Sequence, residues 1–147
     1  MSTEPEHRTA GRILALDVGR RRIGLAVSDP LGLTAQGLET LQRTNNREDM
    51  AALASLAEQW EVALLLIGYP VNMSGEAGRQ AEWVREFAER LGSETGLPVK
   101  LWDERLTTAE AERVLRQSGI SIQKRARAVD RLAAVILLQS YLDAQAQ

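Results

Sequence analysis

The sequence predicts an α/β fold in which helices cover both faces of a mixed five-stranded sheet. Its 147 residues, 44% of them apolar, suffice for one domain with a sizeable core but not for two. Three β-rich segments precede any helical pattern, which indicates an antiparallel meander. Strands and helices then alternate, as is typical of parallel strands joined by crossover helices. The expected element order is βββαβαβα, with any site at the carboxyl ends of the parallel strands.

The meander is predicted from three segments near the start of the chain. Residues 12–17 and 22–29 are β-rich runs, and Gly19 allows a tight turn between them. Residues 33–42 form a weaker third strand. The chain is therefore expected to fold back on itself twice before its first helix.

The middle of the chain alternates helix and strand. Asn45 stands three residues before Glu48, a capping pattern that predicts a helix up to Trp60. The apolar run at 62–67 is typical of a fully buried parallel strand. Apolar residues at helical spacing predict a second helix from about residue 76, with Gly92 and Gly96 near its end.

The remaining elements are one strand and two helices. Residues 98–103 form the strand, and a capping box opens a helix over 107–117. A last helix is expected over 128–144. We expect residues 1–10 to be a mobile N-terminal tail, so that the domain spans 11–147.

Acidic residues stand at the ends of two predicted strands. Asp17 closes an apolar run, where a buried charge is costly unless something compensates it. It is either a site residue or an Asx turn that caps the hairpin. Asp103 and Glu104 end the second strand on opposite faces, so at most one faces Asp17. The other acid is expected to pair with Arg105 or simply to end the strand.

Asp130 begins the apolar stripe of the last predicted helix. Either it projects into a site, or it is a first-turn carboxylate favoured by the helix dipole. The second interpretation requires the helix to start near Ala128. The stripe consists of Ala133, Ala134, Leu137, Leu138 and Tyr141.

Acids on separate elements would supply oxygen ligands suited to Mg²⁺ or Mn²⁺. Two such ions could activate a water and stabilise the leaving oxygen in phosphodiester hydrolysis. The chain has no cysteine, and its one histidine, His7, lies in the predicted tail. Serine–histidine and cysteine–histidine mechanisms therefore lack a base.

Composition restricts the class of protein. The formal charge of -2 does not fit a sequence-independent nucleic-acid coat protein, although basic residues cluster at 20–22 and 124–131. We expect neither a secretory signal nor a membrane span, and a cysteine-free chain suits a reducing compartment. A cytoplasmic protein with no membrane partner is expected.

Four ordered motifs resemble the YqgF/RuvX family over about residues 12–143. They are LDVGRRRIG at 16–24, GYPVNMSG at 68–75, DERLTT at 103–108 and DRLAA at 130–134. The resemblance implies a ribonuclease H-like fold related to RuvC resolvases. It also implies metal and catalytic roles for Asp17, Glu104 and Asp130, and thereby selects Glu104 over Asp103. Tyr69 departs from the family, which more often has leucine there.

Nucleic-acid contacts are expected from basic and polar residues around these motifs. Alternatively, the charged runs are solvated faces, and Asn72 belongs to a plain loop and helix cap. Trp60, Trp83 and Trp102 are expected to pack in the core or at its rim rather than to stack on bases. The candidate contacts are Arg20, Arg21, Arg22, Asn72, Arg105, Lys124, Arg125 and Arg127.

The expected function is metal-dependent hydrolysis of structured nucleic acid. The resemblance implies maturation of the 5′ end of pre-16S rRNA first and Holliday junction resolution second. A resolvase needs two symmetry-related sites, so a homodimer would favour it. A non-catalytic nucleic-acid or ribosome-assembly module is a further alternative. An ATP-handling enzyme is disfavoured, because such proteins bind nucleotide between two related domains.

Overall fold

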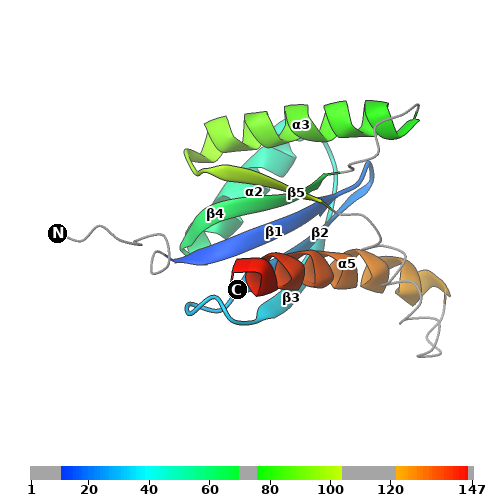
Figure 1. Cartoon of the computed structure of the whole chain (residues 1–147). Coiled ribbons are helices and arrows are strands. Elements are labelled where there is room, and N and C mark those ends of the chain that lie inside the picture. Colours follow the sequence, from blue (N-terminus) through cyan, green and yellow to red (C-terminus); the bar gives the residue numbers. More distant parts are fainter. Residues whose placement is uncertain (1–10, 70–75, 104–121, 146–147) are drawn as a thin grey trace.

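The computed structural model describes residues 11–69, 76–103 and 122–145 (Figure 1). The expected tail at 1–10 and the expected helix at 107–117 lie outside these residues. In the described part, five strands form one sheet, and two layers of helix cover its two faces.

The sheet has the mixed topology that the sequence predicts. Its spatial order is β3-β2-β1-β4-β5. The first three strands pair in antiparallel fashion, whereas β1, β4 and β5 run parallel. The carboxyl ends of β1, β4 and β5 therefore meet at one edge. The bounds are β1 (Arg12–Val18), β2 (Arg22–Ser28), β3 (Ala35–Gln42), β4 (Val62–Tyr69) and β5 (Val99–Asp103).

The turn between β1 and β2 is tight, as expected. The Gly19 N–H donates to the carbonyl of Arg22 over 2.9 Å. A Cβ at position 19 would lie 2.9 Å from that same carbonyl oxygen, so the close approach requires glycine.

The expected start of the third strand at residue 33 is wrong, because the preceding loop is longer. The Asp29 carboxylate accepts the N–H groups of Leu33 and Thr34, each over 2.7 Å. These bonds hold the backbone in a loop through Thr34, and β3 begins at Ala35.

Helices α2 (Asn46–Gln59) and α3 (Glu76–Thr95) cover one face of the sheet. Asn45 caps α2 as predicted, and its side chain accepts the Glu48 N–H over 2.9 Å. Helix α3 ends at Thr95, next to the glycine at which the sequence predicts its end, and Gly96 has a positive φ of 72°.

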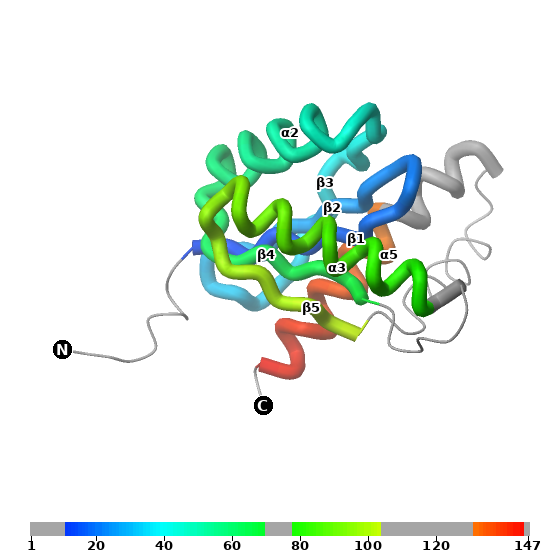
Figure 2. Tube along the Cα trace, turned by 90° about the horizontal axis from the view of Figure 1, so that it is seen from above, coloured from blue at the N-terminus to red at the C-terminus, as the bar shows by residue number. Residues whose placement is uncertain are grey.

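Helix α5 (Ile122–Gln145) covers the opposite face (Figures 1 and 2). The expected start near Ala128 is wrong. The segment from 122 to 128 consists mainly of strong helix formers and contains neither glycine nor proline, so the helix can begin earlier. The apolar stripe begins at Ala133 and therefore does not by itself indicate the earlier turns of α5.

Each face of the sheet has its own buried cluster. Leu14, Leu16 and Val18 alternate along β1 toward α2 and α3. Ala15 lies between them and packs toward Leu137 and Leu138 of α5. None of the helices in the described segments is long and apolar enough to span a bilayer.

Candidate active site

Asp17 lies at the carboxyl end of β1, on the face that α5 covers. Its neighbours Leu16 and Val18 point into the core beneath α2 and α3. Since successive side chains of a strand alternate, Asp17 shares the face of Ala15. The residue is half-buried at the edge where the parallel strands end. This is the position that the sequence predicts for a site residue.

Two glycines flank Asp17 in the sheet. Gly24 of β2 pairs with it directly. On the other side, Leu16 pairs with Ile67 of β4, so Gly68 follows next to Asp17. Both glycines are buried, so neither β2 nor β4 places a side chain at the position that pairs with Asp17. Gly68 is expected to end the apolar run of its strand, but it lies within β4. The sequence signal for both positions is that each glycine adjoins an otherwise apolar strand segment.

Asp103 lies on the other face of the sheet. Leu101 packs with the cluster beneath α3, and Trp102 packs toward α5. Strand alternation then places Asp103 on the α3 side, where it is exposed. Asp103 therefore does not share the face of Asp17, in agreement with the expectation that at most one of the two acids does.

The start of α5 points toward the same edge as Asp17. The Gln139 side chain accepts the Ala35 N–H at the beginning of β3, and the Arg131 Nε donates to the Leu38 carbonyl further along that strand. Since β3 ends beside the first residue of β2, earlier residues of α5 approach the Asp17 edge (Figure 1).

Asp130 is well inside α5 rather than in its first turn. The helix begins at Ile122, and its described first turn contains no acidic residue. The interpretation of Asp130 as a first-turn carboxylate is therefore wrong, because it required a start near Ala128. The side chain itself lies outside the described side chains.

The structure describes only some of the other candidate residues. Arg20 and Arg21 are exposed in the β1–β2 turn, and Arg22 is half-buried at the start of β2. Among the side chains that the structure describes, no group of three acids or histidines could hold a metal ion. Glu104, Asn72 and Arg105 lie outside the described residues, and the side chains of Lys124, Arg125 and Arg127 do so too.

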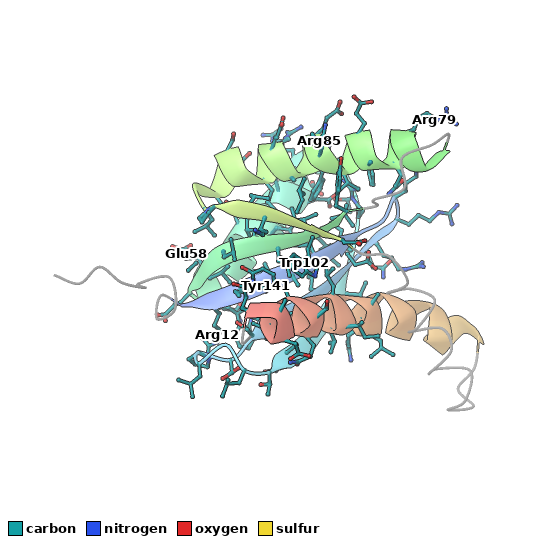
Figure 3. The ribbon with its side chains drawn as sticks, in the orientation of Figure 1. Arg12, Glu58, Arg79, Arg85, Trp102 and Tyr141 are labelled. Carbon is teal, nitrogen blue, oxygen red and sulfur yellow. The ribbon has the colours of Figure 1, made fainter. Side chains whose placement is uncertain are left out.

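An aromatic pair joins β5 to the C-terminal part of α5 (Figure 3). The rings of Trp102 and Tyr141 meet edge to face at a centroid distance of 5.0 Å. The Trp102 Nε1 also donates to the Ser140 hydroxyl over 3.3 Å. Burial raises the pKa of Tyr141. Trp60 and Trp83 pack against the opposite core, so packing at the rim is the confirmed role of the three tryptophans.

Tyr69, the departure from the family motif, joins the end of β4 to α3. The Arg85 Nη2 donates to the Tyr69 hydroxyl. The same guanidinium lies 5.5 Å from the centroid of the tyrosine ring. Arg85 therefore provides a hydrogen-bond partner for the Tyr69 hydroxyl, a group that leucine lacks.

Comparison with known proteins identifies the family. A family model described as "RuvX: Holliday junction resolvase" matches residues 11–144. The chain belongs to the RuvX family. A Koribacter versatilis relative is 59% identical over 133 residues, covering 90% of this chain and 87% of its own. A Clostridium novyi relative is 49% identical, covering 90% and 98%. Both relatives are named "Putative pre-16S rRNA nuclease".

Solved structures with the same fold include two resolvases bound to junctions. T. thermophilus RuvC in complex with a Holliday junction substrate has a TM-score of 0.57 at 14% identity, covering 92% of this chain and 96% of its own. The Fowlpox virus resolvase with Holliday junction DNA has a TM-score of 0.59 at 12% identity, covering 92% and 99%. These similarities establish the ribonuclease H-like fold that the sequence motifs imply.

Proposed function

We propose that this chain is a divalent-metal-dependent nuclease that matures the 5′ end of pre-16S rRNA. The observation that carries the proposal is the half-buried carboxylate of Asp17, at the end of a central strand and between two glycines. The curated relatives support the rRNA substrate, because their name describes it and they match most of the chain. We assign the activity to one domain over residues 11–147.

The donor set fits Mg²⁺ or Mn²⁺. Asp17, Glu104 and Asp130 would hold the metal, and all three offer carboxylate oxygens, which hard divalent cations prefer. Two bound ions would supply an activated water and charge stabilisation at the leaving oxygen. Asp17 orients the site because its strand is fixed on both sides by neighbouring strands.

The faces of the sheet favour Glu104 over Asp103 as the second acid. Asp103 lies on the side of α3, whereas Asp17 lies on the side of α5. A ligand set that includes Asp17 needs its other members on the α5 face. The acid next to Asp103 in the chain meets that requirement if the alternation of β5 continues by one residue.

Basic residues on two elements would hold the nucleic-acid backbone. Arg20, Arg21 and Arg22 stand in the turn that follows Asp17. The backbone of α5 carries a second basic run near its start, at the end of the helix that faces the same edge. We assign this second run to phosphate contacts, together with two residues from elsewhere in the chain. The residues are Lys124, Arg125, Arg127, Asn72 and Arg105.

Holliday junction resolution is the second candidate, and the description of the family model favours it. Cutting a junction symmetrically requires two sites related by a twofold axis, so this function requires a homodimer. A chain that resolves junctions should therefore be dimeric in solution at the concentration at which it cuts.

The experiment compares wild type with Asp17→Asn on labelled pre-16S rRNA leader fragments and four-way DNA junctions, each with Mg²⁺, Mn²⁺ or EDTA. We expect metal-dependent cutting by the wild type. Asp17→Asn should lower its rate about a thousand-fold, equivalent to about 4 kcal/mol of transition-state stabilisation, while binding persists. The preferred substrate decides between the two candidate functions.

Asp103→Asn is the matched control, because it makes the same chemical change on the other face of the sheet. It should retain the wild-type rate within about a factor of two. Equal losses in the two variants would contradict the assignment of faces. A wild type that binds both substrates but cuts neither with any metal would instead support the non-catalytic module.

A further inference from the structure

A cavity of about 620 Å³ lies beside the β1–β2 turn, on the side of α2 and α3. We name it the arginine groove, and the lining residues that matter here are Arg20, Arg21, Arg43, Asp49 and Trp83. It lies on the face of the sheet opposite to Asp17. Asp17, the residue of the assigned metal set whose side chain the structure describes, does not line it.

The arginine groove carries net positive charge. Among the described residues that line it, Asp49 is the single acid. Its carboxylate is buried and receives the Arg43 Nε–H over 2.9 Å and the Thr44 N–H over 3.1 Å. Asp49 is therefore neutralised within the wall. Arg20 and Arg21 are exposed, and their two positive charges give the groove its net positive charge.

Arg43 makes the wall of the arginine groove rigid. Besides Asp49, it donates from Nη2 to the Asn46 side chain over 2.8 Å and from Nη1 to the Gly19 carbonyl over 3.1 Å. Its backbone N–H donates to the Arg21 carbonyl over 2.9 Å. These bonds join the β1–β2 turn to the start of α2, so the turn is held in place before any ligand arrives.

Trp83 prearranges one of the two exposed arginines. The guanidinium of Arg20 lies 5.1 Å from the centroid of the Trp83 ring, and that of Arg43 lies 5.3 Å from it. A guanidinium stacked on an indole keeps its in-plane N–H donors available for a planar or tetrahedral anion. Phosphate is the anion that such a fork recognises with two donors.

The β1–β2 turn connects the groove to the candidate active site. Asp17 precedes the turn on the α5 face, and Arg20 and Arg21 follow within the same turn on the groove side. We infer that the arginine groove binds backbone phosphates of the nucleic-acid strand that flanks the cleavage site. This inference rests on the proposed nuclease function, because it places the strand relative to Asp17.

The test measures binding in the cleavage-deficient Asp17→Asn protein. Fluorescein-labelled single-stranded RNA and DNA of one sequence are titrated at several salt concentrations and followed by anisotropy. Adding Arg20→Ala and Arg21→Ala should raise Kd about tenfold at low salt. It should also reduce the slope of log K against log salt by about 1.4, which corresponds to about 0.7 for each lost phosphate contact. The RNA and DNA arms show which strand the groove prefers.

The matched control removes the same charge elsewhere. Arg90 and Lys100 are exposed and do not line the groove. Adding Arg90→Ala and Lys100→Ala to Asp17→Asn should leave the salt slope unchanged. Equal changes in slope for both pairs would overturn the groove, because they would show that any exposed positive charge on the protein contributes equally to binding.

A second measurement uses Trp83 as a local reporter. Binding of unlabelled strand should change the tryptophan emission, because a phosphate on Arg20 alters the cation stacked on that ring. Trp83→Phe preserves an aromatic packing partner, and this variant should lose the emission change while still folding. An emission change that persists in Trp83→Phe would contradict the proposed contact.

Failure of the groove is distinguishable from failure of the nuclease. An unchanged salt slope in the Arg20 and Arg21 variant, or no binding of either strand, overturns the groove whether or not the wild type cuts. Groove-dependent binding by a wild type that cuts nothing overturns the nuclease and leaves the groove. Both properties are measured on the full chain.

Discussion

The two faces of the sheet are built from side chains of different size. Beneath α2 and α3, the central strands present leucine, isoleucine and valine, with Leu14 and Leu16 fully buried on β1. Beneath α5, β1 and β2 present the small residues Ala15, Ala26 and Gly24, whereas β4 contributes the buried Leu66 to this face. On β1 and β2, large side chains therefore fill the first face, whereas small ones leave room for α5 on the second.

This difference sets how closely each helix approaches the sheet. A Cβ at Gly37 of β3 would lie 2.6 Å from the Arg131 Cγ and 3.3 Å from the Val135 Cγ2. Helix α5 therefore rests almost directly on the backbone of β3. Large side chains hold α2 and α3 further out. We therefore expect substitutions that remove side-chain volume to be most destabilising beneath α2 and α3. Substitutions that add volume should be destabilising beneath α5.

The largest expected effect comes from removing volume on the first face. Leu14→Ala should lower the free energy of unfolding by about 2 to 5 kcal/mol, because a fully buried leucine leaves a cavity that its neighbours fill only in part. Denaturant unfolding with an unchanged m-value measures this loss. Leu14→Met, which nearly conserves volume, should cost less than about 1.5 kcal/mol.

Adding volume one residue along the same strand should give the next largest effect. Ala15→Leu places a larger side chain against Leu137 and Leu138 of α5 and should cost about 1 to 3 kcal/mol by overpacking. The same unfolding assay measures it. A neutral or stabilising Ala15→Leu would break the comparison, because it would show spare space beneath α5.

The smallest effect concerns the loop that supports α5. The N–H of Thr34, followed by those of Leu33 and Leu31, lowers the pKa of Asp29 below its ordinary value of 3.8. Gln139 of α5 donates to the carbonyl of Leu33 in the same loop. A lowered pKa means that the stabilisation is complete above the unfolded value and is lost as the pH falls through the folded one.

Asp29→Asn should therefore cost about 1 kcal/mol or less above about pH 5, and this difference from wild type should shrink as the pH falls below about 3.8. Thermal unfolding of both proteins across this pH range measures it. A difference that grows toward low pH would show that the sign is wrong and that Asp29 does not organise this loop.

Local patterns predicted most of the fold. The capping of α2 by Asn45, the turn at Gly19 and the buried run of β4 follow from contacts within a few residues, and the structure confirms each. The start of β3 was mistaken because side-chain bonds from Asp29 extend the loop. The start of α5 was mistaken because apolar periodicity marks burial, whereas a helix can begin before it is buried.

The candidate site was only partly predictable. Sequence motifs pointed to Asp17, but the glycines beside it come from β2 and β4 and meet it only through strand register. The arginine groove was not foreseen, because Arg43 joins Gly19, Asp49 and Trp83 from separate parts of the chain. No local pattern records such contacts.

The sequence alone determined the element types of the described residues, the mixed sheet, the family motifs and the alternation of side chains along each strand, because side-chain periodicity is a local property. Only the tertiary structure decided that Asp17 lies between two glycines, that Asp103 faces away from it, and that the β1–β2 turn separates the candidate active site from a basic groove. These facts depend on strand order and register, which bring distant residues together and which no single segment specifies.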